Sequence, residues 1–216
     1  MNKVFSTNII VELLGFVIAF VFLHKDNDKV WKSQVLYLLI VVIAESSGRY
    51  MIKGVHYKNN SWIYNLLLIA ETFSLTLMFN NILNAFYKGK LFFYLGLILF
   101  TIVYLLELIA HGFYIYNSNC DTVMSVYYCT CCFFYYYFLL KEDGFHQLYH
   151  LAPFWWVNGV LFFYFGNIIC DLFFSKFSKM PDFYLRYNII QALIIILYIC
   201  WSYAFICKYQ QRKLAQ

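Results

Sequence analysis

Charged residues are scarce in this sequence. Asp, Glu, Lys and Arg make up 12% of its 216 residues, whereas about 25% is usual for a soluble domain. Hydrophobic residues account for 63%, and the mean hydropathy is +0.64. These values exclude an ordinary soluble domain and indicate a polytopic membrane protein.

Proline and glycine are also rare, with two prolines and nine glycines. This composition leaves little room for long irregular segments. We therefore expect membrane spans joined by short loops, with no linker and no soluble domain. The first apolar run follows Lys3 but lacks a small-residue cleavage pattern before His24, so we interpret it as a span rather than a signal peptide.

The apolar runs have the length of membrane-spanning helices, which need about 20 residues to cross the hydrocarbon core. A transmembrane barrel would instead show alternating segments of about 10 residues. Residues 36–44 and 189–199 are almost continuously apolar, which favours helices. We predict an all-α membrane protein with a single heptahelical domain over residues 1–216. Its seven transmembrane helices are expected at 4–23, 34–52, 62–83, 91–113, 122–140, 152–174 and 183–206.

Basic residues predict the orientation, because seven spans place the termini on opposite sides. The face with the N-terminus has six basic residues once the embedded Arg49 is set aside: Lys3, Lys53, Lys58, Lys176, Lys179 and Arg186. The other face has nine: Lys25, Lys29, Lys32, Lys88, Lys90, Lys141, Lys208, Arg212 and Lys213. The positive-inside rule then places the N-terminus outside and the C-terminus in the cytoplasm.

Tryptophan and tyrosine are enriched at membrane–water interfaces. Trp155, Trp156 and Trp201 are therefore expected in an aromatic belt at the cytoplasmic face. Trp62 and Tyr64 are expected in a second belt at the outer face.

Seven ionisable side chains lie inside the predicted spans. Such groups cost a few kcal/mol or more at membrane depth, so they usually face a protein interior or a water-filled cavity and mark function. All seven fall in the outer half of the membrane when each helix is followed in its own direction. They are Glu12, Glu45, Arg49, Glu71, Glu107, His111 and Asp171.

Residues four apart share one helix face, and three helices carry a polar pair at this spacing. The last span adds Asn188 and Gln191 near its outer end. We predict a polar binding pocket between spans 1, 2, 3, 4, 6 and 7 that opens to the outer side. The pairs that contribute to it are Glu45 with Arg49, Glu107 with His111, and Asn167 with Asp171.

Polar contacts between helices can also serve packing alone, at about 0.6 kcal/mol each on average. In this chain, however, the predicted pocket sets four glutamates against one arginine. That is a poor packing arrangement unless some carboxyl groups carry protons. The acidic surplus favours proton exchange, cation binding or ligand binding over a purely structural network.

Two known kinds of seven-helix membrane protein, retinal-binding proteins and zinc-dependent hydrolases, need residues that this sequence lacks. The last predicted span has no lysine to hold retinal, since Lys208 lies beyond it. Hydrolases of the ceramidase and adiponectin-receptor type need three zinc-binding histidines, whereas His111 is the only histidine within a predicted span. Cys129, Cys131 and Cys132 cluster without the paired spacing of a zinc site. We expect no metal site and no cofactor.

Short motifs occur on three of the predicted spans. Glu45 lies on the second, the third opens with NSWIYN at 60–65 and carries Glu71, and the sixth contains FWWVNG at 154–159 followed by Tyr164 and Gly166. With these motifs, nearly the whole chain resembles an uncharacterised heptahelical integral membrane protein family of Bacteroidetes. The resemblance implies the heptahelical topology. Some members are encoded near sensor kinases, but the family has no assigned activity, and the resemblance supports topology more than function.

The leading functional hypothesis is a ligand- or ion-sensing component of the cell inner membrane. A ligand, cation or proton would change the network around Glu45, Arg49 and Glu71, and a cytoplasmic or membrane signalling partner would detect the shift in helix packing. The basic tail at 208–216 would contact that partner or anionic lipid. The lipid bilayer and a second copy of the chain are the other partners considered, and nucleic acid is not expected.

Two alternatives remain open. The first is a small proton- or cation-coupled transporter with Glu71 or Glu45 as the carrier, which needs polar residues that continue to the cytoplasmic side. The second is an intramembrane hydrolase using Glu107 and His111, although an enzyme is the less favoured class. The polar candidates on the cytoplasmic side are Asn80, Asn81, Asn84 and Asn158.

Overall fold

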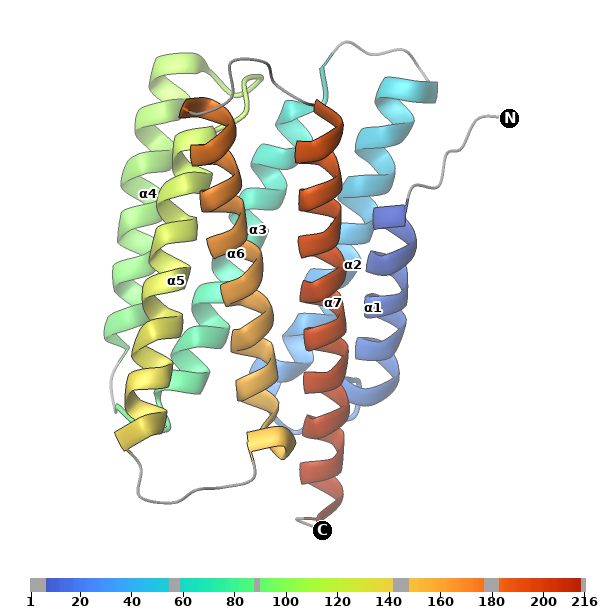
Figure 1. Cartoon of the computed structure of the whole chain (residues 1–216), viewed down its shortest axis with the longest axis vertical. Coiled ribbons are helices and arrows are strands. Elements are labelled where there is room, and N and C mark those ends of the chain that lie inside the picture. Colours follow the sequence, from blue (N-terminus) through green and yellow to red (C-terminus); the bar gives the residue numbers. More distant parts are fainter. Residues whose placement is uncertain (1–6, 55–58, 88–89, 142–147, 177–182, 215–216) are drawn as a thin grey trace. The chain divides into compact units, whose positions relative to one another are not determined.

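The computed structural model describes residues 7–54, 59–87, 90–141, 148–176 and 183–214, and every regular element within these ranges is helical (Figure 1). The all-α prediction is therefore confirmed for this part of the chain. The elements are α1 (Thr7–Leu23), α2 (Lys29–Arg49), the π-helical turn η1 (Tyr50–Gly54), α3 (Ser61–Leu83), α4 (Leu91–His111), α5 (Ser118–Lys141), the 3-10 turn η2 (Leu148–His150), α6 (Ala152–Lys176) and α7 (Phe183–Leu214).

Six of these helices, α2 to α7, are long and apolar enough to cross a membrane. The described part of α1 has 17 residues, or about 25 Å at 1.5 Å per residue, against a hydrocarbon core of about 30 Å. The structure is thus compatible with a polytopic membrane protein, while the seven-span topology stays a prediction. The predicted last span ended at residue 206, whereas α7 continues to Leu214, so residues 208–214 of the basic segment are helical.

Large apolar side chains cover much of the outer surface of the helices. On α4, for example, Ile98, Leu106 and Ile109 are 60%, 62% and 83% exposed. Exposed apolar area on this scale is unusual for a soluble monomer. It is expected where lipid surrounds the helices.

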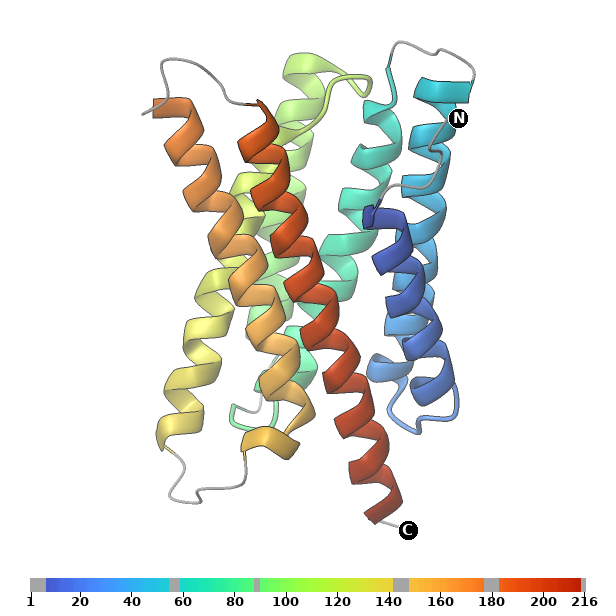
Figure 2. The same ribbon diagram turned by 45° about the vertical axis from the view of Figure 1, so that its right-hand side comes forward.

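The chain forms two compact units, Met1–Met124 and Ser125–Gln216, with the boundary inside α5. In the first unit, α1 packs on α2, α2 on α3, and α3 on α4. In the second, α6 and α7 lie side by side along most of their length, and α7 extends past η2 (Figures 1 and 2). The single heptahelical domain remains a prediction.

Side-chain hydrogen bonds hold α2 against α3 at several depths. The Asn81 amide donates to Asp28 Oδ2 (3.1 Å), the Gln34 amide donates to Ser74 Oγ (3.1 Å), and the Tyr64 hydroxyl donates to Glu45 Oε2 (3.4 Å). In each pair the two residue numbers sum to 108 or 109. That constant sum means that a single antiparallel register satisfies all three bonds, and we call these pairs the α2–α3 polar pairs.

Aspartate Asp28 also sets where α2 begins. Its Oδ1 accepts hydrogen bonds from the backbone amides of Val30 (2.9 Å) and Trp31 (3.5 Å), as an N-cap does. The helix therefore begins at Lys29, earlier than the predicted residue 34. One side chain thus caps α2 with one oxygen and binds α3 with the other.

In the second unit, tryptophans pack between α6 and α7. The rings of Trp156 and Trp201 stack with centroids 5.7 Å apart and planes 1° apart, and both side chains are buried. The prediction that both belong to an interfacial belt was wrong, since they pack in the core of this unit. Trp155 keeps a more peripheral place against Tyr203.

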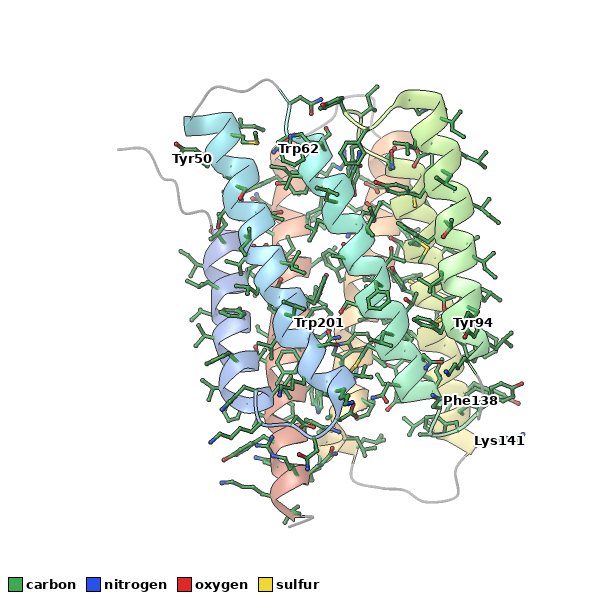
Figure 3. The ribbon with its side chains drawn as sticks, turned by 180° about the vertical axis from the view of Figure 1, so that it is seen from behind. Tyr50, Trp62, Tyr94, Phe138, Lys141 and Trp201 are labelled. Atoms are coloured by element: carbon green, nitrogen blue, oxygen red, sulfur yellow. The ribbon has the colours of Figure 1, made fainter. Side chains whose placement is uncertain are left out.

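Aromatic side chains of α2, α3 and α4 lie toward the two ends of the first unit, and the outer belt stays a prediction. Tyr50 at the end of α2 and Trp62 at the start of α3 lie at the same end of this unit, and Tyr94 lies toward the opposite end (Figure 3). Tyr50 and Tyr94 are exposed and Trp62 is half-buried. These positions are those expected for aromatic side chains at a membrane interface.

Glycine Gly159 allows α6 to approach α7 closely. A Cβ at this position would lie 3.0 Å from Cys200 Cβ and 3.2 Å from the Leu197 carbonyl oxygen. Both atoms belong to the rigid part of α7. Close helix contacts of this kind are a common use of small residues in membranes.

We expect Gly159→Ala to destabilise the protein by about 1–3 kcal/mol, because the added methyl group forces α7 away from α6. The measurement is thermal unfolding in detergent micelles. The matched control is Ile199→Ala on α7, where the side chain is 63% exposed and the change should be smaller. Equal midpoints for the glycine variant and the wild type would show that the two helices separate without cost.

Candidate functional site

An ion pair lies at the end of α2. Glu45 and Arg49 are one helical turn apart, and Glu45 Oε2 lies 3.9 Å from Arg49 Nε. The same carboxylate oxygen accepts the hydrogen bond from Tyr64 on α3. Both ion-pair side chains are mostly buried, with 21% and 18% of their surface exposed. The predicted pairing of Glu45 with Arg49 is present in the structure.

Glycine Gly48 makes room for this arrangement. A Cβ at Gly48 would lie 3.1 Å from the Tyr64 hydroxyl oxygen and 3.2 Å from Asn60 Nδ2. Asn60 Nδ2 also donates a hydrogen bond to the Gly48 carbonyl (3.2 Å). The absence of a side chain here lets α3 bring a phenol and an amide onto the last turn of α2. The π-helical turn η1 begins directly after Arg49.

Glutamate Glu12 on α1 completes this group. Its side chain is 4% exposed, and its Oε2 has no hydrogen-bond partner among the described residues. The charges that act on it are those of Glu45 and Arg49. Glu12, Glu45, Arg49 and Tyr64 therefore form one group on three helices of the first unit, which we call the acid–arginine cluster.

Glutamate Glu107 has a different role from the one expected. Its Oε1 accepts hydrogen bonds from the backbone amide of Asn119 (3.0 Å) and from Asn119 Nδ2 (2.8 Å), and its Oε2 accepts one from the Cys120 amide (2.8 Å). These amides belong to the first turn of α5, where a negative charge is favoured. His111 is exposed, and no hydrogen bond or ion pair joins it to Glu107 among the described residues.

Asparagine Asn65, which the sequence analysis did not select, anchors the segment between α4 and α5. Its Nδ2 donates to the carbonyls of Phe113 and Ile115, both at 2.8 Å, and its Oδ1 accepts from the Asn117 amide (3.0 Å). The side chain is fully buried. The signal was an amide inside a predicted span, which was noted in the NSWIYN motif but was not ranked with the charged residues.

Glutamate Glu71 is half-buried on α3, and its charge acts on Tyr116 in the connection between α4 and α5. The Tyr116 hydroxyl donates to Asp121 Oδ2 (2.9 Å). Desolvation of this hydroxyl, together with the carboxylates of Asp121 and Glu71, raises the pKa of Tyr116. The phenol therefore stays a hydrogen-bond donor at neutral pH.

The remaining predicted site residues lie in the second unit. Asp171 Oδ1 pairs with Arg186 Nη2 at 2.6 Å, and both side chains are about half exposed. The partner of Asp171 is thus a cation that had been assigned to the outer face, and Asn167 is half-buried one turn earlier. Asn188 is exposed, and Gln191 donates to the Tyr187 hydroxyl (3.2 Å).

The structure therefore brings together Glu12, Glu45 and Arg49, and it places Glu107 at the α5 terminus. The six-span pocket would join residues of both units, so it stays a prediction. Metal binding has no obvious location, since no group of three or more His, Cys, Asp or Glu side chains that could hold an ion occurs in the described ranges. The seven cysteines are buried free thiols.

Comparisons of the chain with models of protein families, with curated proteins and with solved structures find no match. The resemblance to a Bacteroidetes family, seen in the sequence motifs, stays a prediction.

We expect Glu107→Ala to destabilise the protein by about 1–3 kcal/mol, because two buried backbone amides of α5 lose their acceptor. The loss should appear in the thermal midpoint in micelles and as faster hydrogen exchange at Asn119 and Cys120. Asp171→Ala removes an ion pair that is half exposed, so its effect should stay under about 1 kcal/mol. Similar midpoints for both variants would contradict a capping role for Glu107.

Proposed function

We propose that this chain is a multi-pass protein of the cell inner membrane with seven spans, its N-terminus outside and its C-terminus in the cytoplasm. Six long apolar helices and the shorter α1 support this topology. The excess of basic residues on the face with the C-terminus supports the orientation.

Reporter fusions test the topology. Alkaline phosphatase, which is active only outside the inner membrane, should be active when fused to the N-terminus and inactive when fused after Gln216. A fluorescent protein that folds only in the cytoplasm should give the opposite pattern. Matching activity at both ends would require an even number of spans and would exclude α1 as a span.

We further propose that the protein is a ligand- or ion-sensing component that passes a signal to another protein. The observation that carries this proposal is the acid–arginine cluster, in which Glu12 is buried without a hydrogen-bond partner for Oε2 beside an ion pair. Glu107, by contrast, is used in holding α5. The carboxyl group of Glu12 is thus available to gain a new partner.

Helix α2 offers a route for such a change. Glu45 and Arg49 lie near one end of α2 and the Asp28 cap lies at the other, about 25 Å away at 1.5 Å per residue. The α2–α3 polar pairs hold the two helices in one register between these ends. A displacement at Glu45 therefore moves α2 as a rigid element rather than fading within one turn.

A partner surface is available on the last turns of α7. This helix has 32 residues, or about 48 Å, and so exceeds a hydrocarbon core of about 30 Å. Near its end, Arg212 and Lys213 lie 5.1 Å and 4.7 Å from the Tyr209 ring, and Gln211 donates to the His150 carbonyl (2.7 Å). An ordered basic surface of this kind suits a cytoplasmic signalling partner or anionic lipid.

The alternatives receive less support. A transporter needs a continuous polar path toward the cytoplasmic side. Of the candidates for it, Asn81 donates to Asp28 and Asn158 accepts from Tyr136, whereas Asn80 Oδ1 has no hydrogen-bond partner among the described residues. A hydrolase needs Glu107 together with His111, and Glu107 binds the amides of α5 instead. Sensing requires only the acid–arginine cluster and the α2–α3 polar pairs, both of which are present.

Two measurements on proteoliposomes separate sensing from transport. With an outside change of pH or Na⁺ as the probe, hydrogen exchange in the connection from His24 to Asp28 should change several-fold in the wild type, because α2 moves. Glu45→Gln should abolish that change, and Asp171→Asn should leave it intact. No ion flux above that of protein-free vesicles is expected. Flux that depends on Glu45 would replace the sensing proposal by transport.

A further inference from the structure

The acid–arginine cluster contains more carboxyl groups than cations. Glu12 and Glu45 supply two carboxyl groups, Arg49 supplies one guanidinium, and Tyr64 supplies one phenol. The guanidinium and the phenol both approach Glu45 Oε2, at 3.9 Å and 3.4 Å. Among the described residues Arg49 forms its ion pair with Glu45 and none with Glu12, although its charge acts on both carboxyl groups.

Glutamate Glu12 also has no other source of compensation among the described residues. It is 4% exposed, so water at the surface does not solvate it, and Oε2 has no hydrogen-bond donor. An ionised carboxylate that is buried with one oxygen lacking a hydrogen-bond donor is costly in a protein. A carboxyl group that carries a proton removes the charge and lowers that cost.

We infer that the acid–arginine cluster binds a proton at Glu12, and that Arg49 is shared between Glu45 and Glu12 according to whether this proton is bound. The inference rests on the proposed sensing function and names its ligand. With the proton bound, Arg49 pairs with Glu45 as observed. When the proton leaves, Glu12 becomes a second carboxylate and attracts Arg49 toward α1.

The local chemistry favours a proton over a metal ion. Ca²⁺ needs about 6–8 oxygen ligands, and Mg²⁺ needs near-ideal octahedral geometry. The groups that act on Glu12 are Glu45 and Arg49 on α2 and Tyr64 on α3. A guanidinium in this group repels a second cation, whereas a proton needs only one free carboxylate oxygen. Glu12 Oε2 is such an oxygen.

The consequence for the fold is a change in the contact between α1 and α2. Arg49 lies in the last turn of α2, directly before η1. A move of its guanidinium from Glu45 to Glu12 weakens the bond within α2 and creates one between α1 and α2. Because α2 is held to α3 by the α2–α3 polar pairs, the new bond shifts α1 relative to both helices.

Infrared difference spectroscopy of the full chain in lipid vesicles tests this inference. The wild type should show the C=O stretching band of a protonated carboxyl group that disappears as the pH is raised. Glu12→Gln should lose this band. Glu45→Gln should keep it only at lower pH than the wild type, because Arg49 is then free to pair with ionised Glu12. Glu12→Asp should shift the band rather than remove it, which covers the case in which Glu12→Gln does not fold.

Three results would overturn the inference: a band that persists in Glu12→Gln, a band that does not respond to pH, or a band removed by Na⁺ at constant pH. Failure here is distinct from failure of sensing. If the band is absent but hydrogen exchange at His24 to Asp28 still responds to Na⁺, sensing stands with another ligand. If the band titrates but exchange never responds, the proton site stands and sensing fails.

Discussion

The register between α2 and α3 is the constraint on which the rest of the first unit depends. Helices in a bilayer gain little from hydrophobic contact with each other, so polar pairs and close packing decide how they align. Asp28 with Asn81, Gln34 with Ser74, and Glu45 with Tyr64 satisfy one antiparallel register along most of both helices. The bond between Glu45 and Tyr64 can form because the other two pairs hold α2 and α3 in this register.

The start of α3 is a junction that follows from this register. Asn60 binds the Gly48 carbonyl on α2, Asn59 binds the Tyr114 carbonyl (2.6 Å), and Asn65 binds the carbonyls of Phe113 and Ile115. Amide side chains thus satisfy backbone groups that regular helices leave open at their ends. The position of the segment between α4 and α5 is therefore tied to the same helix that positions Tyr64.

Much of the fold was predictable because hydropathy alone defines membrane helices, and α2 to α7 lie close to their predicted ranges. Partners were harder to predict than positions. The i, i+4 spacing predicted the pair Glu45 and Arg49, since both lie on one helix. It could not predict the partners of Glu107, because these are backbone amides 12 and 13 residues further along the chain, on the next helix. Trp156 and Trp201 were wrongly expected at the interface because tryptophan occurs both in packed cores and at membrane interfaces, and the sequence alone does not distinguish the two.

Two buried glutamates show why burial alone does not define a site. Glu107 is 7% exposed and Glu12 is 4% exposed, so their solvent access is nearly equal. Glu107 has three hydrogen-bond donors, two of them backbone amides that cannot move without unwinding α5. Glu12 Oε2 has none among the described residues, and the neighbouring guanidinium of Arg49 pairs with Glu45. A carboxylate fixed by backbone donors has one stable arrangement, whereas one that shares a guanidinium with a second carboxylate, as proposed for Glu12, has two. Only the second kind can respond to a ligand, which is why the acid–arginine cluster, rather than the better-bonded Glu107, carries the function proposed for this protein.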